Sequence, residues 1–109
     1  MELINEKDAM SRLSNMKSLY AKLLKKFDGR AMLDDLLAKI KSGDAVAAEA
    51  SAHTLKGVAA NLSLEDLRAK TEAVDTILKG GDVNVDTAEI EASVAQTVEA
   101  VAAWIAANS

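Results

Sequence analysis

Apolar residues recur every three or four positions along most of the chain, which is the spacing that gathers them on one face of a helix. Polar residues that favour helix ends interrupt this pattern, so it predicts several helices in succession. We expect Asn5 to cap a short first helix and Ser14 to cap a second, which Asp28 and Gly29 end. The apolar positions of this second helix are Met16, Leu19, Tyr20, Leu23, Leu24 and Phe27.

Four more helices are predicted after this point: one ending at Gly43, one from Asp44 to about Leu62, one from Ser63 to Gly80-Gly81, and one opened by Asp86 and Glu89. Ser63 with Asp66 three residues later is similar to a capping box, in which both side chains bond the first turn. The inward positions expected in the first, third and fourth of these helices are Leu33, Leu36, Leu37, Ile40, Leu64, Leu67, Val74, Ile77, Leu78, Ile90, Val94, Val98, Val101 and Ile105.

Short connections of two to six residues between the later helices require antiparallel neighbours. The sequence therefore predicts a single all-α domain over residues 1–109, an antiparallel up-down-up-down four-helix bundle with the N-terminal helices packed alongside. Composition agrees with this fold class, because alanine and leucine supply most of the apolar residues and both are strong helix formers.

Charge and composition exclude several classes of function. The chain has no cysteine and one histidine, which excludes disulfides and thiolate zinc sites and argues against a structural metal centre. A net charge of −4 argues against binding nucleic acid or an anionic membrane surface, and no apolar run reaches the roughly 20 residues of a membrane span. We expect a monomeric cytoplasmic protein, and Met1 together with an end soon after Trp104 favours a free-standing one.

The helix expected from Asp44 carries the most distinctive residues. Its inward stripe consists of Ala48, Ala52, Leu55, Ala59 and Leu62. At about 100° per residue, His53 lies about 140° from the centre of that stripe and Gly57 about 180°, so both are expected to face outward.

Gly57 costs the helix about 1 kcal/mol relative to alanine, and an outward position gives no reason for it within the bundle. We therefore expect another protein to approach this face closely. The predicted docking surface is small and nearly uncharged, and it consists of Val46, Ala50, His53, Gly57 and Ala60.

The run HTLKGVAANLS, residues 53–63, also has a chemical reading. An imidazole can be phosphorylated on a ring nitrogen, and Lys56 one turn later can offset the added negative charge. The run resembles the motif of the histidine phosphotransfer (HPt) domains of two-component phosphorelays. It departs from the usual motif at Ser63, where the family usually has glycine.

The resemblance implies a phosphocarrier without kinase activity of its own and without a cofactor. His53 would accept a phosphoryl group from the aspartate of one receiver domain and pass it to another, the receivers belonging to a hybrid sensor kinase or a response regulator. Lys56, on an exposed flank, would stabilise the phosphoryl charge rather than the fold, and Gly57 would clear space for the receiver. Any magnesium would be held by the receiver.

Two other interpretations stay open from the sequence. One is a helical adaptor that binds receivers without passing phosphate. The other is an enzyme that uses His53 as an acid or base, although no pocket-forming loop accompanies it. A paired-carboxylate site is a weaker idea, because the candidate residues are spread along one predicted helix and its cap: Glu65, Asp66, Glu72 and Asp75.

Overall fold

The computed structural model describes residues 1–108, and within them it contains six helices and no strand. The helices are α1 (Glu6–Arg12), α2 (Lys17–Lys25), α3 (Gly29–Lys41), α4 (Ala45–Asn61), α5 (Glu65–Lys79) and α6 (Ala88–Asn108). No helix in this part of the chain is both long and apolar enough to cross a bilayer.

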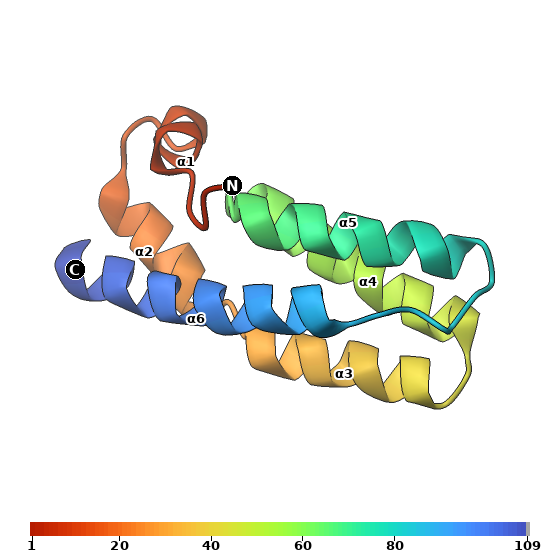
Figure 1. Ribbon diagram of the computed structural model, residues 1–109. Helices are drawn as coiled ribbons and strands as arrows, with labels where there is room; N and C mark the ends of the chain where they lie inside the picture. The colour runs from red at the N-terminus through yellow and green to blue at the C-terminus, as the bar shows by residue number, and fades with distance from the viewer. Residues whose placement is uncertain (109) are drawn as a thin grey trace.

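Helices α3 to α6 form the expected four-helix bundle (Figure 1). Contacts run from α3 to α4, from α4 to α5, from α5 to α6 and from α6 back to α3, so the four helices enclose one core. The molecule is elongated along the bundle axis, with extents of 41 × 21 × 21 Å. Antiparallel packing follows from the short turns after α3 and α4, whereas residues 80–87 between α5 and α6 form a longer connection than the two to six residues expected.

Helices α1 and α2 lie at one end of the bundle, where α2 packs against α6 (Figure 1). The phenol of Tyr20 on α2 is buried, stacks edge-on against Trp104 of α6, and donates a hydrogen bond to the carbonyl of Leu62. Burial, together with the charges of Glu6 and Asp8, raises the pKa of Tyr20 to about 12.

The turn between α4 and α5 is held by the N-terminal segment as well. The backbone N–H of Asn5 donates to the carbonyl of Ser63 at 2.9 Å, and the N–H of Asp66 donates to the carbonyl of Glu2 at 3.0 Å. The hydroxyl of Ser63 donates to the carboxylate of Asp8 on α1 at 2.6 Å. Three separate N-terminal residues thus fix the end of the helix that carries His53.

Several predicted helix ends are wrong, although the helices themselves exist. Ser14 does not cap α2: Met16 occupies that position, while Ser14 has a φ of 52° in the turn after α1. Asp28 and Gly29 do not end α2, which stops at Lys25; Asp28 instead caps α3 by accepting a bond from the N–H of Ala31.

The predicted capping box at Ser63 is also wrong. Leu64 is the N-cap of α5 and makes no side-chain cap bond, whereas Ser63 is buried with a φ of 57°. This left-handed conformation favours glycine, which explains physically why glycine suits the position. Ile77 was expected in the core but is 41% exposed, because α5 turns it away from its neighbours.

Candidate functional site

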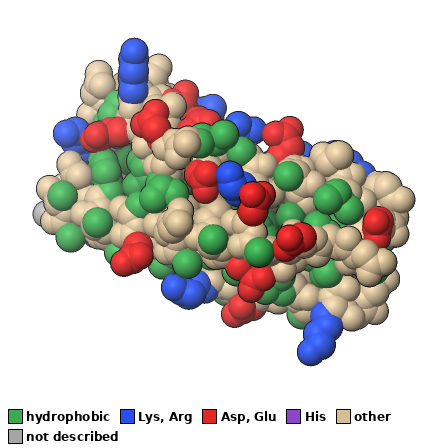
Figure 2. All heavy atoms as spheres, viewed as in Figure 1, with side chains coloured by type: hydrophobic (Ala, Val, Ile, Leu, Met, Phe, Trp, Pro, Cys, Tyr) green, Lys and Arg blue, Asp and Glu red, His purple; other side chains and the backbone are tan. Residues whose placement is uncertain are grey.

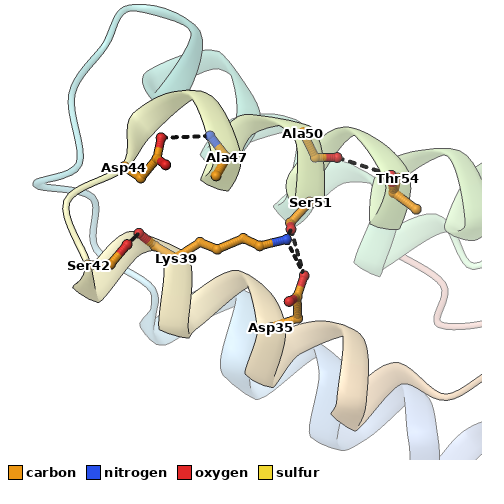
Figure 3. A network of polar contacts seen from close by, with 8 residues as sticks. All are labelled: Asp35, Lys39, Ser42, Asp44, Ala47, Ala50, Ser51 and Thr54. Atoms are coloured by element: carbon orange, nitrogen blue, oxygen red, sulfur yellow. Dashed lines mark hydrogen bonds and ion pairs between the residues drawn. The ribbon is translucent and has the colours of Figure 1, made fainter.

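Helix α4 positions the candidate site through its own amphipathic pattern. Asp44 caps it by accepting a hydrogen bond from the N–H of Ala47 at 3.0 Å (Figure 3). Its inward residues Ala48, Ala52, Leu55 and Ala59 have no exposed surface. With that stripe fixed in the core, helical rotation leaves the imidazole of His53 exposed on the opposite side.

The other residues of the predicted docking surface lie beside His53. Val46 is 82% exposed, Ala50 and Gly57 are exposed, and Ala60 is half-buried. A Cβ added at Gly57 would meet nothing within 4 Å, so no neighbour inside the protein requires glycine there. This position is free space into which another molecule can move.

Lys56 does not have the freely solvated position that the sequence suggested. Its side chain is 24% exposed, and its ammonium donates to Oδ2 of Asp75 on α5 at 2.9 Å. The Asp75 side chain is only 1% exposed, and Lys79 also contacts its Oδ2, at 3.4 Å. The expected exposed position of Lys56 is therefore wrong, because its side chain compensates a buried charge.

The pKa values of this pair follow from the contact. The hydrogen bond to Asp75 raises the pKa of Lys56, which stays cationic. Burial alone would raise the pKa of Asp75, but the hydrogen bond and charge of Lys56, with those of Lys79, outweigh burial and hold the pKa below its usual value. Both groups are thus ionised near neutral pH, and a fixed positive charge lies one turn from His53.

Two carboxylates approach the imidazole. A ring nitrogen of His53 and one carboxylate oxygen each of Glu49 and Asp75 lie within 4.8 Å of one another. Glu49 precedes His53 by one helical turn and is half-buried, and Asp75 reaches the site from α5. The second oxygen of Asp75, Oδ1, is buried and has no hydrogen-bond partner among residues 1–108. The site therefore combines one imidazole, two carboxylates and a lysine that is paired with one of those carboxylates.

A polar network joins α3 to α4 through Ser51 (Figure 3). The ammonium of Lys39 donates to Asp35 at 2.9 Å and to the hydroxyl of Ser51 at 2.8 Å, and Ser51 donates to Asp35 at 2.7 Å. The hydrogen bonds from Ser51 and Lys39 lower the pKa of Asp35. This network holds α4 in register with α3, and its side chains border an open groove that Ala50 and Thr54 also line.

The face of the molecule seen in Figure 2 carries acidic and basic side chains intermingled, without a large patch of either sign. The visible face offers no basic surface of the kind that binds nucleic acid.

Sequence reasoning missed Asp75 and Glu49 as parts of the site. Glu49 had a detectable signal, because residues four apart on a helix lie on one face. No signal in the sequence pointed to Asp75, since its approach to His53 depends on how α5 is rotated against α4. It was grouped with three other acidic residues, and none of those three belongs to the cluster around His53.

Comparison with known proteins agrees with the resemblance read from the motif. The family model described as the Hpt domain matches residues 8–104, which is nearly the whole chain. The search of curated proteins and the search of solved structures each gave no match.

Proposed function

Because the chain belongs to the Hpt domain family, whose members transfer phosphoryl groups in two-component phosphorelays, we propose that it relays a phosphoryl group between receiver-domain aspartates through His53. The observation that carries this proposal is an exposed imidazole, the only one in the chain, beside a lysine that a buried carboxylate holds in place.

The transfer needs little from the protein besides position and charge. A ring nitrogen of His53 attacks the phosphorus of an aspartyl phosphate on the donor receiver. The P–N bond forms while the P–O bond breaks, and the aspartate leaves as a carboxylate. The second transfer is the reverse, with the aspartate of another receiver as the attacking group. Any magnesium that assists belongs to the receiver.

Lys56 supplies the positive charge on this side of the reaction. Its ammonium is tethered at 2.9 Å to Asp75, a carboxylate that itself lies within 4.8 Å of the His53 and Glu49 ligand atoms. The phosphoryl oxygens carry spread negative charge, and a nearby cation that is already oriented stabilises them with little reorganisation. Lys79 shares Asp75, so the carboxylate keeps a partner when Lys56 turns toward the phosphoryl group.

The partner is proposed to be a receiver domain of a hybrid sensor kinase or a response regulator. It would dock on Val46, Ala50, Gly57 and Ala60, where the side chains are small and uncharged. Gly57 leaves open space beside the imidazole for the loops that carry the receiver's aspartate. A monomeric state and a cytoplasmic location belong to this proposal, because they leave that surface free for soluble receivers.

The proposal is tested with a receiver carrying radiolabelled aspartyl phosphate. We expect acid-labile, alkali-stable label on this protein and its complete loss in His53→Gln. Thr54→Ala is the matched control, since Thr54 follows His53 on α4 and its hydroxyl donates only to the carbonyl of Ala50, and it should keep the label. Receiver binding without any label transfer would instead identify an adaptor, and full labelling of His53→Gln would disprove the role of the imidazole.

A further inference from the structure

The cluster of Glu49, His53 and Asp75 has a composition that phosphoryl transfer alone does not require. A phosphohistidine is an anion, yet two carboxylates each place an oxygen within 4.8 Å of one of the imidazole nitrogens. Lys56 and Lys79 both contact Oδ2 of Asp75, and its Oδ1 has no hydrogen-bond partner in the described chain. A buried carboxylate oxygen without a partner is costly, which indicates a further ligand.

We propose that Glu49, His53 and Asp75 bind a divalent transition metal ion, Zn²⁺ being the reference case. One imidazole nitrogen and two carboxylate oxygens form a three-ligand set of the type that zinc accepts, with a fourth position left for water. Imidazole excludes the hard ions Mg²⁺ and Ca²⁺ as the preferred occupants, since these favour oxygen ligands only.

The geometry is compatible with such an ion after small movements. Ligand atoms around tetrahedral zinc lie about 3.4 Å apart, given bonds of about 2.0–2.1 Å. Here the three atoms lie within 4.8 Å of one another. Asp75 is fixed by burial and by its lysine contacts, whereas His53 is exposed and Glu49 half-buried, so these two side chains can close on the ion. Glu49 and His53 share one face of α4, one turn apart.

Metal binding and phosphorylation then compete, because an ion bound to one ring nitrogen of His53 makes the imidazole a weaker nucleophile. This consequence rests on the proposed function, whereas metal binding itself does not. Transition metal ions would hold the protein in a form that accepts a phosphoryl group slowly.

The binding test uses calorimetric titration of ZnCl₂ into the unphosphorylated full chain. We expect one saturable site, abolished in His53→Gln and weakened by at least about tenfold in Glu49→Gln and in Asp75→Asn. Asp34→Asn, an exposed carboxylate on α3 outside the cluster, is the matched control and should bind like wild type. Should Asp75→Asn fail to fold, Glu49→Gln still decides the result, since the ion pairs of Lys56 and Lys79 are with Asp75 rather than with Glu49.

The single histidine gives a second readout, because the chain shows only one set of imidazole signals in an NMR spectrum. Zn²⁺ should shift these signals, and MgCl₂ should not. Zn²⁺ should then slow phosphoryl acceptance in wild type more than in Glu49→Gln, each measured against its own metal-free rate. Binding that survives unchanged in both Glu49→Gln and Asp75→Asn would overturn the site, and binding without slower transfer would overturn only its link to phosphorylation.

Discussion

Ser63 shows how one residue can combine a strained backbone with a useful side chain. Its φ of 57° is unfavourable for a residue with a Cβ, while its hydroxyl bonds Asp8 at 2.6 Å. The Ser63→Gly and Ser63→Ala variants both lose the hydroxyl, but only glycine relieves the strain. We expect Ser63→Gly to be more stable than Ser63→Ala by about 1 kcal/mol in urea denaturation.

Ser42 provides the control for this comparison. It has an ordinary helical φ of −71° at the end of α3, so alanine should be at least as stable as glycine there. Equal stability of the two Ser63 variants would mean that the left-handed conformation costs nothing at that position.

The Lys56–Asp75 pair predicts that stability and transfer can be separated. Lys56→Ala leaves the buried Asp75 with only the longer Lys79 contact, so it should lower the Tm and slow phosphoryl transfer. Adding Asp75→Asn removes the uncompensated charge. The double variant should therefore recover much of the Tm while transfer stays roughly tenfold or more below wild type.

Thermal melts and single-turnover transfer of the two single variants and the double variant test this separation. Recovery of both properties in the double variant would make Lys56 a purely structural residue. An unchanged Tm in Lys56→Ala would show that Lys79 alone compensates Asp75.

At the scale of elements, a partly buried hydrogen bond joins α5 to α6. The hydroxyl of Ser93 donates to Asp66 at 2.7 Å, and this bond, more than the nearby Lys70, lowers the pKa of Asp66. Because the pKa of Asp66 is lower in the folded protein than in the unfolded chain, its carboxylate stabilises the fold at pH values above about 4. This stabilisation is lost as the pH falls through the pKa of the folded protein. Ser93→Ala should cost about 1–2 kcal/mol at pH 7 and less at pH 3.

Urea denaturation at both pH values measures this difference. Thr76→Ala is the control, because its hydroxyl bonds a backbone carbonyl and has no carboxylate partner, so its effect should not depend on pH. A cost of Ser93→Ala that is the same at pH 3 and pH 7 would show that Asp66 does not sense the bond.

Helix positions could be predicted from the sequence because apolar spacing reports directly which face is buried. Helix ends could not be predicted, since serine, aspartate and asparagine occur both as helix caps and in left-handed turns. Ser14 and Ser63 lie in left-handed turns. His53 and Gly57 were found by rotation around one helix. Asp75 was not, because its place depends on packing between two helices.

At the scale of the whole molecule, Gly57 links the stability of the domain to its surface. A Cβ there meets nothing within 4 Å, so Gly57→Ala should stabilise the isolated protein by roughly 0.5–1 kcal/mol. Gly57→Leu should weaken receiver binding, because its side chain fills the space beside the imidazole.

Calorimetric titration with a cognate receiver and thermal melts measure both effects. Gly29→Ala is the contrasting case, since a Cβ at Gly29 would lie 2.6 Å from the tip of the Phe27 ring, which must move aside, so this variant should gain less stability than Gly57→Ala. Receiver binding by Gly57→Leu at wild-type affinity would show that the docking surface lies elsewhere.

The anchoring of the α4–α5 turn also has a kinetic consequence. Bundle helices α3, α4 and α5 pack against neighbours in sequence, whereas the bonds of Tyr20 to Leu62 and of Ser63 to Asp8 span 42 and 55 residues. Long-range contacts form late in folding because closing a large loop costs entropy first. The helix that carries His53 can therefore form before α1 and α2 dock, and transient undocking of those two helices would leave the imidazole and its lysine assembled.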